Sequence, residues 1–118
     1  RVEFPGLLCK EDVRLLYLKS NIGIVSSNSE TFGQSIVEPF VLGRCVISTP
    51  VGIANDIIQN GVNGYIYTSQ KDLVEKFDYL YTHQNMIYQM GENNFKERDL
   101  FNWERISQVY KEKILFLS

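Results

Sequence analysis

Cysteine, histidine and long apolar runs are scarce in this chain of 118 residues. It has two cysteines, Cys9 and Cys45, and one histidine, His83, without the spacing of a metal site. No apolar run approaches the roughly 18 residues of a membrane span. No targeting segment is visible after Arg1. The chain lacks an initiator methionine, and we expect it to be a piece of a longer protein.

Charge of one sign is not in excess either. The formal charge is −2 and the isoelectric point is near 5.4, which argues against a general nucleic-acid binder. Apolar residues make up 44% and charged residues 22%, as in an ordinary globular protein of one domain. We expect Cys9 and Cys45 to be buried free thiols in a reducing compartment, and therefore a cytoplasmic protein. His83 is expected on the surface and not as a catalytic base.

Short apolar segments alternate with helical patterns in the first half of the chain. Strands are predicted at residues 2–4, 22–25, 45–48 and 65–67, and helices at residues 10–20, 36–43 and 53–59. This order predicts right-handed βαβ units and a parallel sheet of about four strands with helices on both faces. Gly61 and Gly64 are interpreted as turn glycines.

The second half of the chain is predicted to be helical. Ser69 is expected to cap a helix whose apolar side chains follow helical spacing. These side chains are Leu73, Val74, Phe77, Leu80 and Tyr81. Further helices are predicted at residues 85–93 and 103–117, the latter with one apolar stripe.

The most informative segment lies between Glu30 and Glu38. A short strand, a polar loop, Gly33 and a helical pattern follow one another there. This arrangement presents the free N–H groups of Gly33, Gln34 and Ser35 to an anion such as a phosphate. The two carboxylates could accept hydrogen bonds from vicinal hydroxyl groups, which suggests a nucleotide or a nucleotide sugar.

The spacing alone leaves a purely structural interpretation open. In that interpretation Glu30 caps the helix and Glu38 is a solvated side chain. The serines of the loop are not nucleophile candidates. No histidine is near them in the sequence, and the Gly-x-Ser-x-Gly elbow is absent.

The segment from Glu30 through Glu38 resembles the E-x7-E motif of family 4 (group 1) retaining glycosyltransferases, which have the GT-B fold. The resemblance covers nearly the whole chain, in order. Its other parts are V-E-F-P-G at 2–6, D-V-R-L-L-Y at 12–17, G-R-C-V-I-S-T at 43–49, I-I-Q-N-G-V-N-G-Y at 57–65 and W-x6-Y at 103–110.

The resemblance implies roles for particular residues. Glu30 would hold the sugar hydroxyls of the donor and is the residue assigned to catalysis. The amides around Phe32, Gly33, Gln34 and Ser35 would receive the sugar and the diphosphate, and Glu38 would bind the ribose. The turn at Gly6 and Leu7 would lie near the base. The family needs no metal, and its retaining reaction is described as front-face displacement without a side-chain nucleophile.

The chain also departs from the family pattern. Pro39 stands where the family has alanine, and we expect it to disfavour a helical turn at residues 35–38 and so to shift Glu38. Ser26 replaces the usual proline before Ser27. The Gly-Gly and Pro-Glu pairs that follow the next strand are replaced by Gly52-Ile53 and Asn55-Asp56.

Residues 1–118 thus resemble part of a C-terminal nucleotide-sugar-binding domain. The acceptor domain and the basic residues that would neutralise the diphosphate lie outside this chain. A glycan or lipid-linked acceptor would bind through the missing domain, which could also reach the inner face of a membrane. The isolated piece is expected to be inactive, and either to pair its strands at residues 2–4 and 22–25 directly or to self-associate along that edge. Two alternatives remain open: a non-catalytic binding or assembly module, and a sugar-nucleotide epimerase of the same fold.

Overall fold

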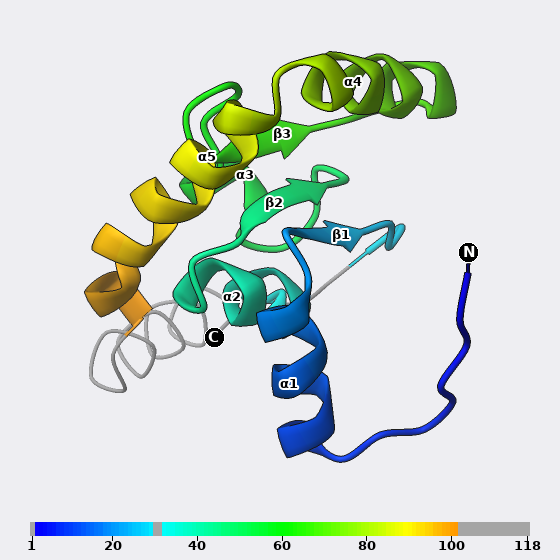
Figure 1. Ribbon diagram of the computed structural model, residues 1–118, viewed down its shortest axis with the longest axis vertical. Helices are drawn as coiled ribbons and strands as arrows, with labels where there is room; N and C mark the ends of the chain where they lie inside the picture. Colours follow the sequence, from blue (N-terminus) through cyan, green and yellow to red (C-terminus); the bar gives the residue numbers. More distant parts are fainter. Residues whose placement is uncertain (1, 30–31, 102–118) are drawn as a thin grey trace, which may run out of the picture.

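The sheet at the centre of the molecule has three parallel strands. A computed structural model describes residues 2–29 and 32–101. The strands are β1 (Ile22–Val25), β2 (Cys45–Ser48) and β3 (Gly64–Ile66), in the order β1-β2-β3 (Figure 1). Ile22 is in register with Cys45, and Val46 with Gly64. The predicted α/β architecture with a parallel sheet is confirmed.

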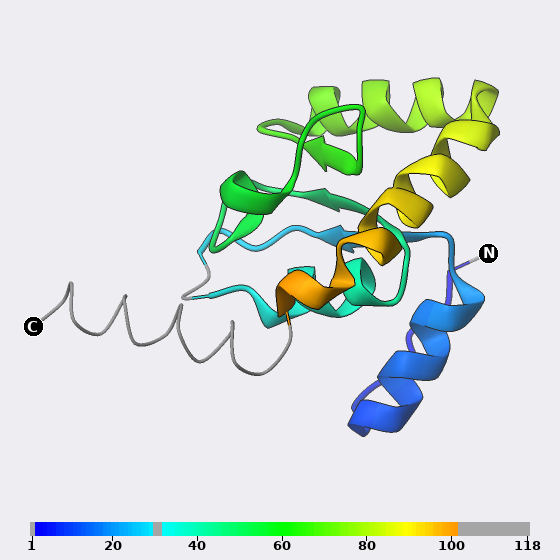
Figure 2. The ribbon, with the colours of Figure 1, turned by 90° about the vertical axis from the view of Figure 1, so that its left-hand side faces the viewer.

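Helices cover both faces of this sheet, as predicted. They are α1 (Lys10–Lys19), α2 (Gln34–Val41), α3 (Ala54–Ile57), α4 (Gln70–Thr82) and α5 (Gln84–Lys96), followed by the 3-10 turn η1 (Arg98–Phe101). Figure 2 shows α4 on one side of the sheet and α2 on the other, with α1 beside α2, whereas α5 runs from the α4 side past the sheet to the level of α2. The structure therefore has three layers.

Two apolar clusters, one on each face, hold these layers together. Residues of β2 supply both: Val46 packs with α2 and α3, whereas Cys45 and Ile47 pack with α4 and α5. All four residues of β2 are buried, as expected of a central strand that has helices on both sides. The sheet has no solvent-exposed face at β2.

The predicted strand at residues 2–4 is wrong. Residues 2–6 have no regular secondary structure, and the side chains of Val2 and Phe4 are 77% and 91% exposed. A strand forms only by pairing with a neighbour. In the described part of the chain, no strand pairs with this segment, and the sheet has three strands rather than four.

The helices of the second half begin largely where the sequence indicates. Ser69 caps α4, since its hydroxyl oxygen accepts a hydrogen bond from the Asp72 N–H at 3.0 Å. Leu80 is buried, but Val74 and Tyr81 are 51% and 77% exposed, so the apolar stripe is narrower than predicted. The helix predicted at residues 103–117 lies outside the described residues.

Gly64 is a strand residue and not a turn residue as predicted. It is the first residue of β3, and a Cβ there would lie 1.8 Å from the carbonyl oxygen of Val46. Gly61 is a turn glycine, as predicted, with φ +82°. The two positions therefore require glycine for different reasons: backbone crowding at Gly64 and a left-handed conformation at Gly61.

Arg44 fixes the C-terminal end of α1. Its Nε donates to the carbonyl of Tyr17 at 2.9 Å, and its Nη2 donates to the carbonyl of Leu18, also at 2.9 Å. A cation at a helix C-terminus satisfies orphan carbonyls and favours the helix dipole. No residue of α1 is fully buried, so this attachment matters more than apolar packing.

Arg44→Met is expected to lower the free energy of unfolding by about 1–2 kcal/mol, because the apolar stem stays while two charge-assisted hydrogen bonds are lost. Urea denaturation measures this change, and amide exchange should show the loss of protection concentrated in α1. Arg14→Met is the matched control on the exposed side of α1. It should leave the free energy of unfolding and the amide protection of α1 unchanged. Equal effects of the two substitutions would contradict the role of Arg44.

Candidate functional site

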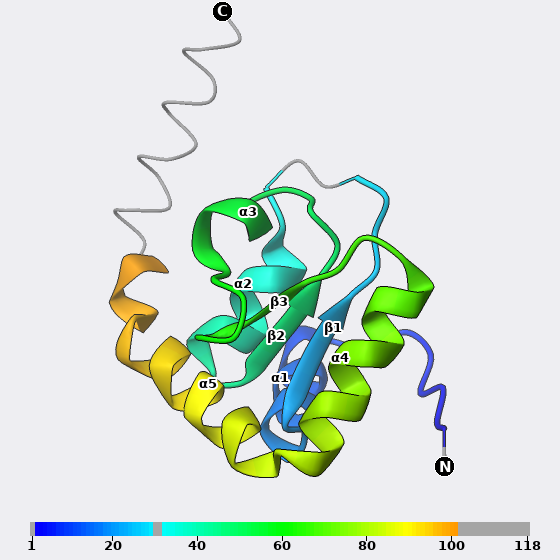
Figure 3. The ribbon, with the colours of Figure 1, turned by 90° about the horizontal axis from the view of Figure 1, so that it is seen from above.

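The loops that follow β1 and β2 are joined at the carboxyl edge of the sheet. The Thr49 N–H donates to the Val25 carbonyl at 3.1 Å, and its hydroxyl donates to the Ser27 carbonyl at 2.6 Å. Farther along, the Ile53 N–H donates to the Phe32 carbonyl at 2.7 Å. Figure 3 shows these loops side by side, with α3 next to the start of α2. Ligands of open parallel sheets bind at this edge.

The N-terminus of α2 lies at the same edge. Gly33 is its N-cap, with φ +105° and ψ +53°, a conformation that favours glycine. The Gly33 carbonyl accepts hydrogen bonds from the N–H groups of Ile36 and Val37. The N–H groups of Gln34 and Ser35, the first two helical residues, have no acceptor within the helix, and both residues are exposed. This end of α2 can therefore receive an anion.

Phe32 anchors the loop in the core. Its side chain is 4% exposed and belongs to the apolar cluster under α2. A Cβ on Gly33 would lie 2.8 Å from Cδ1 of Ile36, so this loop is packed tightly from both sides. The ring of Phe32 thus holds the helix terminus in place, whereas Gln34 and Ser35 face solvent.

Pro39 does not break α2, contrary to our expectation from the sequence. The helix runs without interruption through residues 35–38 and past Pro39. Proline leaves the Ser35 carbonyl without its helical donor, but Ser35 is exposed and water can reach it. The buried Pro39 ring packs on Gly23 of β1, where a Cβ would be 2.6 Å from the Cβ of Pro39.

Glu38 is half-buried on α2. Burial, and in second place the negative charge of Glu38, raise the pKa of the Tyr17 phenol. Glu38 is thus partly shielded from solvent, unlike the freely solvated side chain of the structural interpretation. Tyr17 lies in the D-V-R-L-L-Y segment, where its spacing indicates an apolar helix face and no role in a site.

Two of the predicted donor-binding positions are not brought to this site. The side chain of Leu7 is fully exposed, and a Cβ on Gly6 would have no atom within 4 Å. Their closeness to the base of a donor stays a prediction. Glu30 lies outside the described residues, so the structure gives no distance between Glu30 and Glu38.

The cysteines and the histidine contribute nothing to this edge of the sheet. Cys45 is buried, which raises the pKa of its thiol to about 12 and keeps it protonated. The prediction of a buried Cys9 is wrong: it precedes the exposed helix α1, and its thiol donates to Asp12 at 3.2 Å. His83 is exposed and stacks on Tyr79, as expected for a surface residue.

Metal ligands do not gather in the part of the chain that the structure describes. There, no group of three or more His, Cys, Asp or Glu side chains could hold a metal ion. Arg44, one of the basic residues nearest to the motifs, is engaged at the end of α1. Of the helices described, none is long and apolar enough to cross a membrane.

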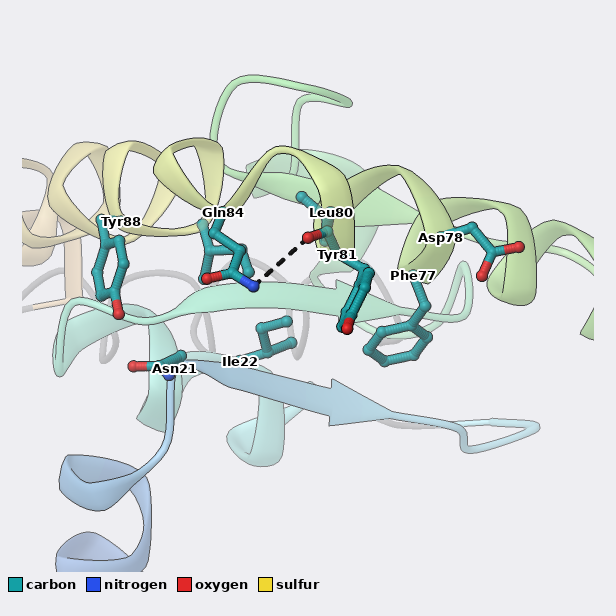
Figure 4. Close-up of a pocket in the computed structure, with 9 residues that line it drawn as sticks. Asn21, Ile22, Phe77, Asp78, Leu80, Tyr81, Gln84 and Tyr88 are labelled. Carbon is teal, nitrogen blue, oxygen red and sulfur yellow. Dashed lines mark hydrogen bonds between the residues drawn. The ribbon is translucent and has the colours of Figure 1, made fainter.

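A groove of about 410 Å³ lies away from this edge, between the start of β1 and helices α4 and α5. Figure 4 shows Phe77, Tyr81 and Tyr88 pointing from the helices toward β1, and the Gln84 side chain donating to the Tyr81 carbonyl at 3.4 Å. The groove has a largely aliphatic and aromatic lining, with Asn21, Asp78 and Gln84 as polar members and no lysine or arginine. It therefore does not coincide with the predicted donor site.

An open parallel α/β sheet with a helix N-terminus at its carboxyl edge defines a Rossmann-like domain. Residues 1–97 match the family described as glycosyl transferases group 1. The chain belongs to this family. An uncharacterized glycosyltransferase of Methanocaldococcus jannaschii is 30% identical over 117 residues, which cover 94% of this chain and 33% of that protein.

Solved structures share the fold. Sucrose-phosphate synthase of Thermosynechococcus elongatus superposes with a TM-score of 0.80 at 24% identity, over 98% of this chain and 31% of that one. Anabaena HepE, solved with UDP and glucose, has a TM-score of 0.80 at 24% identity, over 97% of this chain and 32% of that one. The C-terminal domain of a group 1 glycosyltransferase of Francisella tularensis superposes with a TM-score of 0.70 at 22% identity. The match covers 79% of this chain and 49% of that one. The chain spans about a third of the length of the first two of these proteins, the Methanocaldococcus jannaschii glycosyltransferase and sucrose-phosphate synthase.

Proposed function

We propose that this chain forms the donor-binding part of a retaining glycosyltransferase that uses a nucleotide-diphosphate sugar. The observation that carries the proposal is the N-terminus of α2, where the amides of Gln34 and Ser35 have no acceptor within the helix and lie at the carboxyl edge of the sheet. The family to which the chain belongs and the nucleotide-bound relative support it. The diphosphate would lie at these amides.

The two glutamates would hold the hydroxyl groups of the donor. In this proposal Glu38 binds the ribose and Glu30 binds the transferred sugar and is the residue on which catalysis depends. Charge at the leaving diphosphate is neutralised by helix-terminal amides and by basic residues of the rest of the protein, without a metal. The acceptor, a glycan or a lipid-linked sugar, binds outside this chain, and the protein acts in the cytoplasm or at the inner face of a membrane.

Ser35→Pro tests the phosphate-binding amide directly. Proline is tolerated in the first turn of a helix but has no N–H. UDP-, GDP- and ADP-sugars are titrated calorimetrically onto the full-length protein, and the donor that binds should lose roughly tenfold in affinity in this variant. Ser35→Ala keeps the N–H and should bind normally. If no donor binds, or if both variants bind like the parent protein, the proposal is wrong.

The free edge of β1 leads to a prediction for the isolated chain of 118 residues. Among the described strands β1 pairs only with β2, Ile24 is 48% exposed, and the groove lined by Phe77, Tyr81 and Tyr88 lies alongside. Because unpaired strand edges are templates for other chains, the isolated chain is expected to self-associate with rising concentration in light scattering. A monodisperse monomer with rapidly exchanging amides in β1 would contradict this expectation.

A further inference from the structure

Thr49 uses all of its polar groups at the carboxyl edge of the sheet. It directly follows Ser48, the last residue of β2, which is in register with Val25, the last residue of β1. The Thr49 N–H donates to the Val25 carbonyl at 3.1 Å, and its hydroxyl donates to the Ser27 carbonyl at 2.6 Å. The Thr49 carbonyl accepts hydrogen bonds from the Ser48 hydroxyl and the Val51 N–H, both at 2.8 Å. Thr49 therefore has a fixed position and orientation.

The hydroxyl of Thr49 extends the connection between the two strands beyond their ladder. Ser27 lies two residues past the end of β1, in the β1–α2 loop, residues 26–33. The ladder ends at Val25 and Ser48, so a side chain and not the strand backbone makes this bond. Both Thr49 and Ser27 are half-buried, and a hydrogen bond is stronger where water is partly excluded. The bond fixes the point at which the loop leaves the sheet.

The segment that begins at Thr49 also holds the other end of the β1–α2 loop. The Ile53 N–H donates to the Phe32 carbonyl at 2.7 Å, and both side chains are buried in the apolar cluster under α2. Gly33, the N-cap of α2, follows directly. Figure 3 shows the two loops side by side. Residues 49–53 thus hold the β1–α2 loop at its start through a hydroxyl and at its end through a backbone amide.

We propose that Thr49 is a positioning residue for the donor site. Its hydroxyl sets the path of the β1–α2 loop, and with it the place at which Gln34 and Ser35 present their amides to the diphosphate. The inference rests on the proposed function, because it takes these amides as the diphosphate site. Amides that are held in place before the ligand arrives bind it more tightly, since ordering a loop on binding costs affinity. Thr49 therefore acts on donor affinity without contacting the donor.

Thr49→Val removes the hydroxyl and keeps the branched shape of the side chain. The probe is the nucleoside diphosphate, UDP, GDP or ADP, that binds the full-length protein best in calorimetry. Its affinity should fall about three- to tenfold in Thr49→Val, whereas Thr49→Ser, which keeps the hydroxyl, should retain most of the parent affinity. Thr82→Val is the matched control. It removes a hydroxyl that donates to the Tyr79 carbonyl at 3.0 Å at the end of α4, and it should leave the affinity unchanged.

Amide exchange separates positioning from a loss of stability. At saturating nucleoside diphosphate, the Gln34 and Ser35 amides should be protected in the parent protein and less protected in Thr49→Val. A purely structural role would lower the melting temperature but leave the affinity and this protection as in the parent, and that result would overturn the proposal. If Thr49→Val does not fold, Thr49→Ala is measured in its place, and it should lose affinity to the same degree.

Failure of this inference and failure of the proposed function give different results. If Ser35→Pro weakens binding but Thr49→Val and Thr49→Ala bind like the parent protein, the positioning role is wrong and the proposed function stands. An equal loss of affinity in Thr49→Ser and Thr49→Val would also overturn the role of the hydroxyl. Unchanged affinity in Ser35→Pro would instead overturn the diphosphate site, and the role of Thr49 with it.

Discussion

Gly64→Ala is expected to prevent the chain from folding. The new Cβ would lie 1.8 Å from the Val46 carbonyl oxygen and 2.9 Å from the carbonyl carbon. Val46 and Gly64 are register partners in the parallel pair of β2 and β3, so the strands would have to separate. We expect a loss of more than about 4 kcal/mol, in the range that destroys a small domain. Circular dichroism and urea denaturation measure it.

Gly61→Ala is the matched control for this substitution. Gly61 has φ +82°, but a Cβ there would have no atom within 4 Å. Its cost is the strain of a left-handed residue, about 1–2 kcal/mol. A folded, cooperative Gly64→Ala variant with no more destabilisation than Gly61→Ala would show that the approach of β2 to β3 is looser than described.

Glu30→Ala and Glu38→Ala are each expected to reduce transferase activity of the full-length protein roughly ten- to hundredfold. This corresponds to about 1.5–3 kcal/mol for a hydrogen bond to a charged acceptor. The measurement is the initial rate with the donor identified in the binding screen. The fold should stay intact, because Glu38 is not fully buried in the structure.

The two glutamates should differ toward the free nucleoside diphosphate. Glu38→Ala should weaken its binding, because the proposed partner of Glu38 is the ribose, which the product retains. Glu30→Ala should not, because its proposed partner is the sugar, which is absent from the product. Glu75→Ala on α4 removes an exposed carboxylate remote from the site and serves as the control. Wild-type transfer rates in both site variants would refute the assignment.

Local sequence patterns determined the elements. β1 and β2 have the predicted bounds, because short apolar runs bounded by polar and turn residues leave little freedom in strand placement. The helix cap at Ser69 and the order of strands and helices also followed from local chemistry. The order fixes a parallel sheet, since each strand is separated from the next by a helix on its surface.

Contacts between distant segments decided the rest. Residues 2–4 have the composition of a strand, but no strand of the described chain pairs with them, and they stay irregular. Pro39 is unfavourable in an isolated helix, yet here its ring packs against Gly23 and the helix continues. Neither outcome depends on the local sequence alone, because both depend on what the fold places nearby.

The candidate site divides in the same way. The sequence alone indicated a glycine at the start of a helix and two carboxylates, and so an anion and hydroxyl groups as the ligand. Only the tertiary structure brought Thr49 against the loop after β1, and the ring of Tyr17 against Gly23. The reason is physical: backbone conformation follows from neighbouring residues, whereas the partners of a side chain depend on how helices α1 and α2 pack on the same face of the sheet.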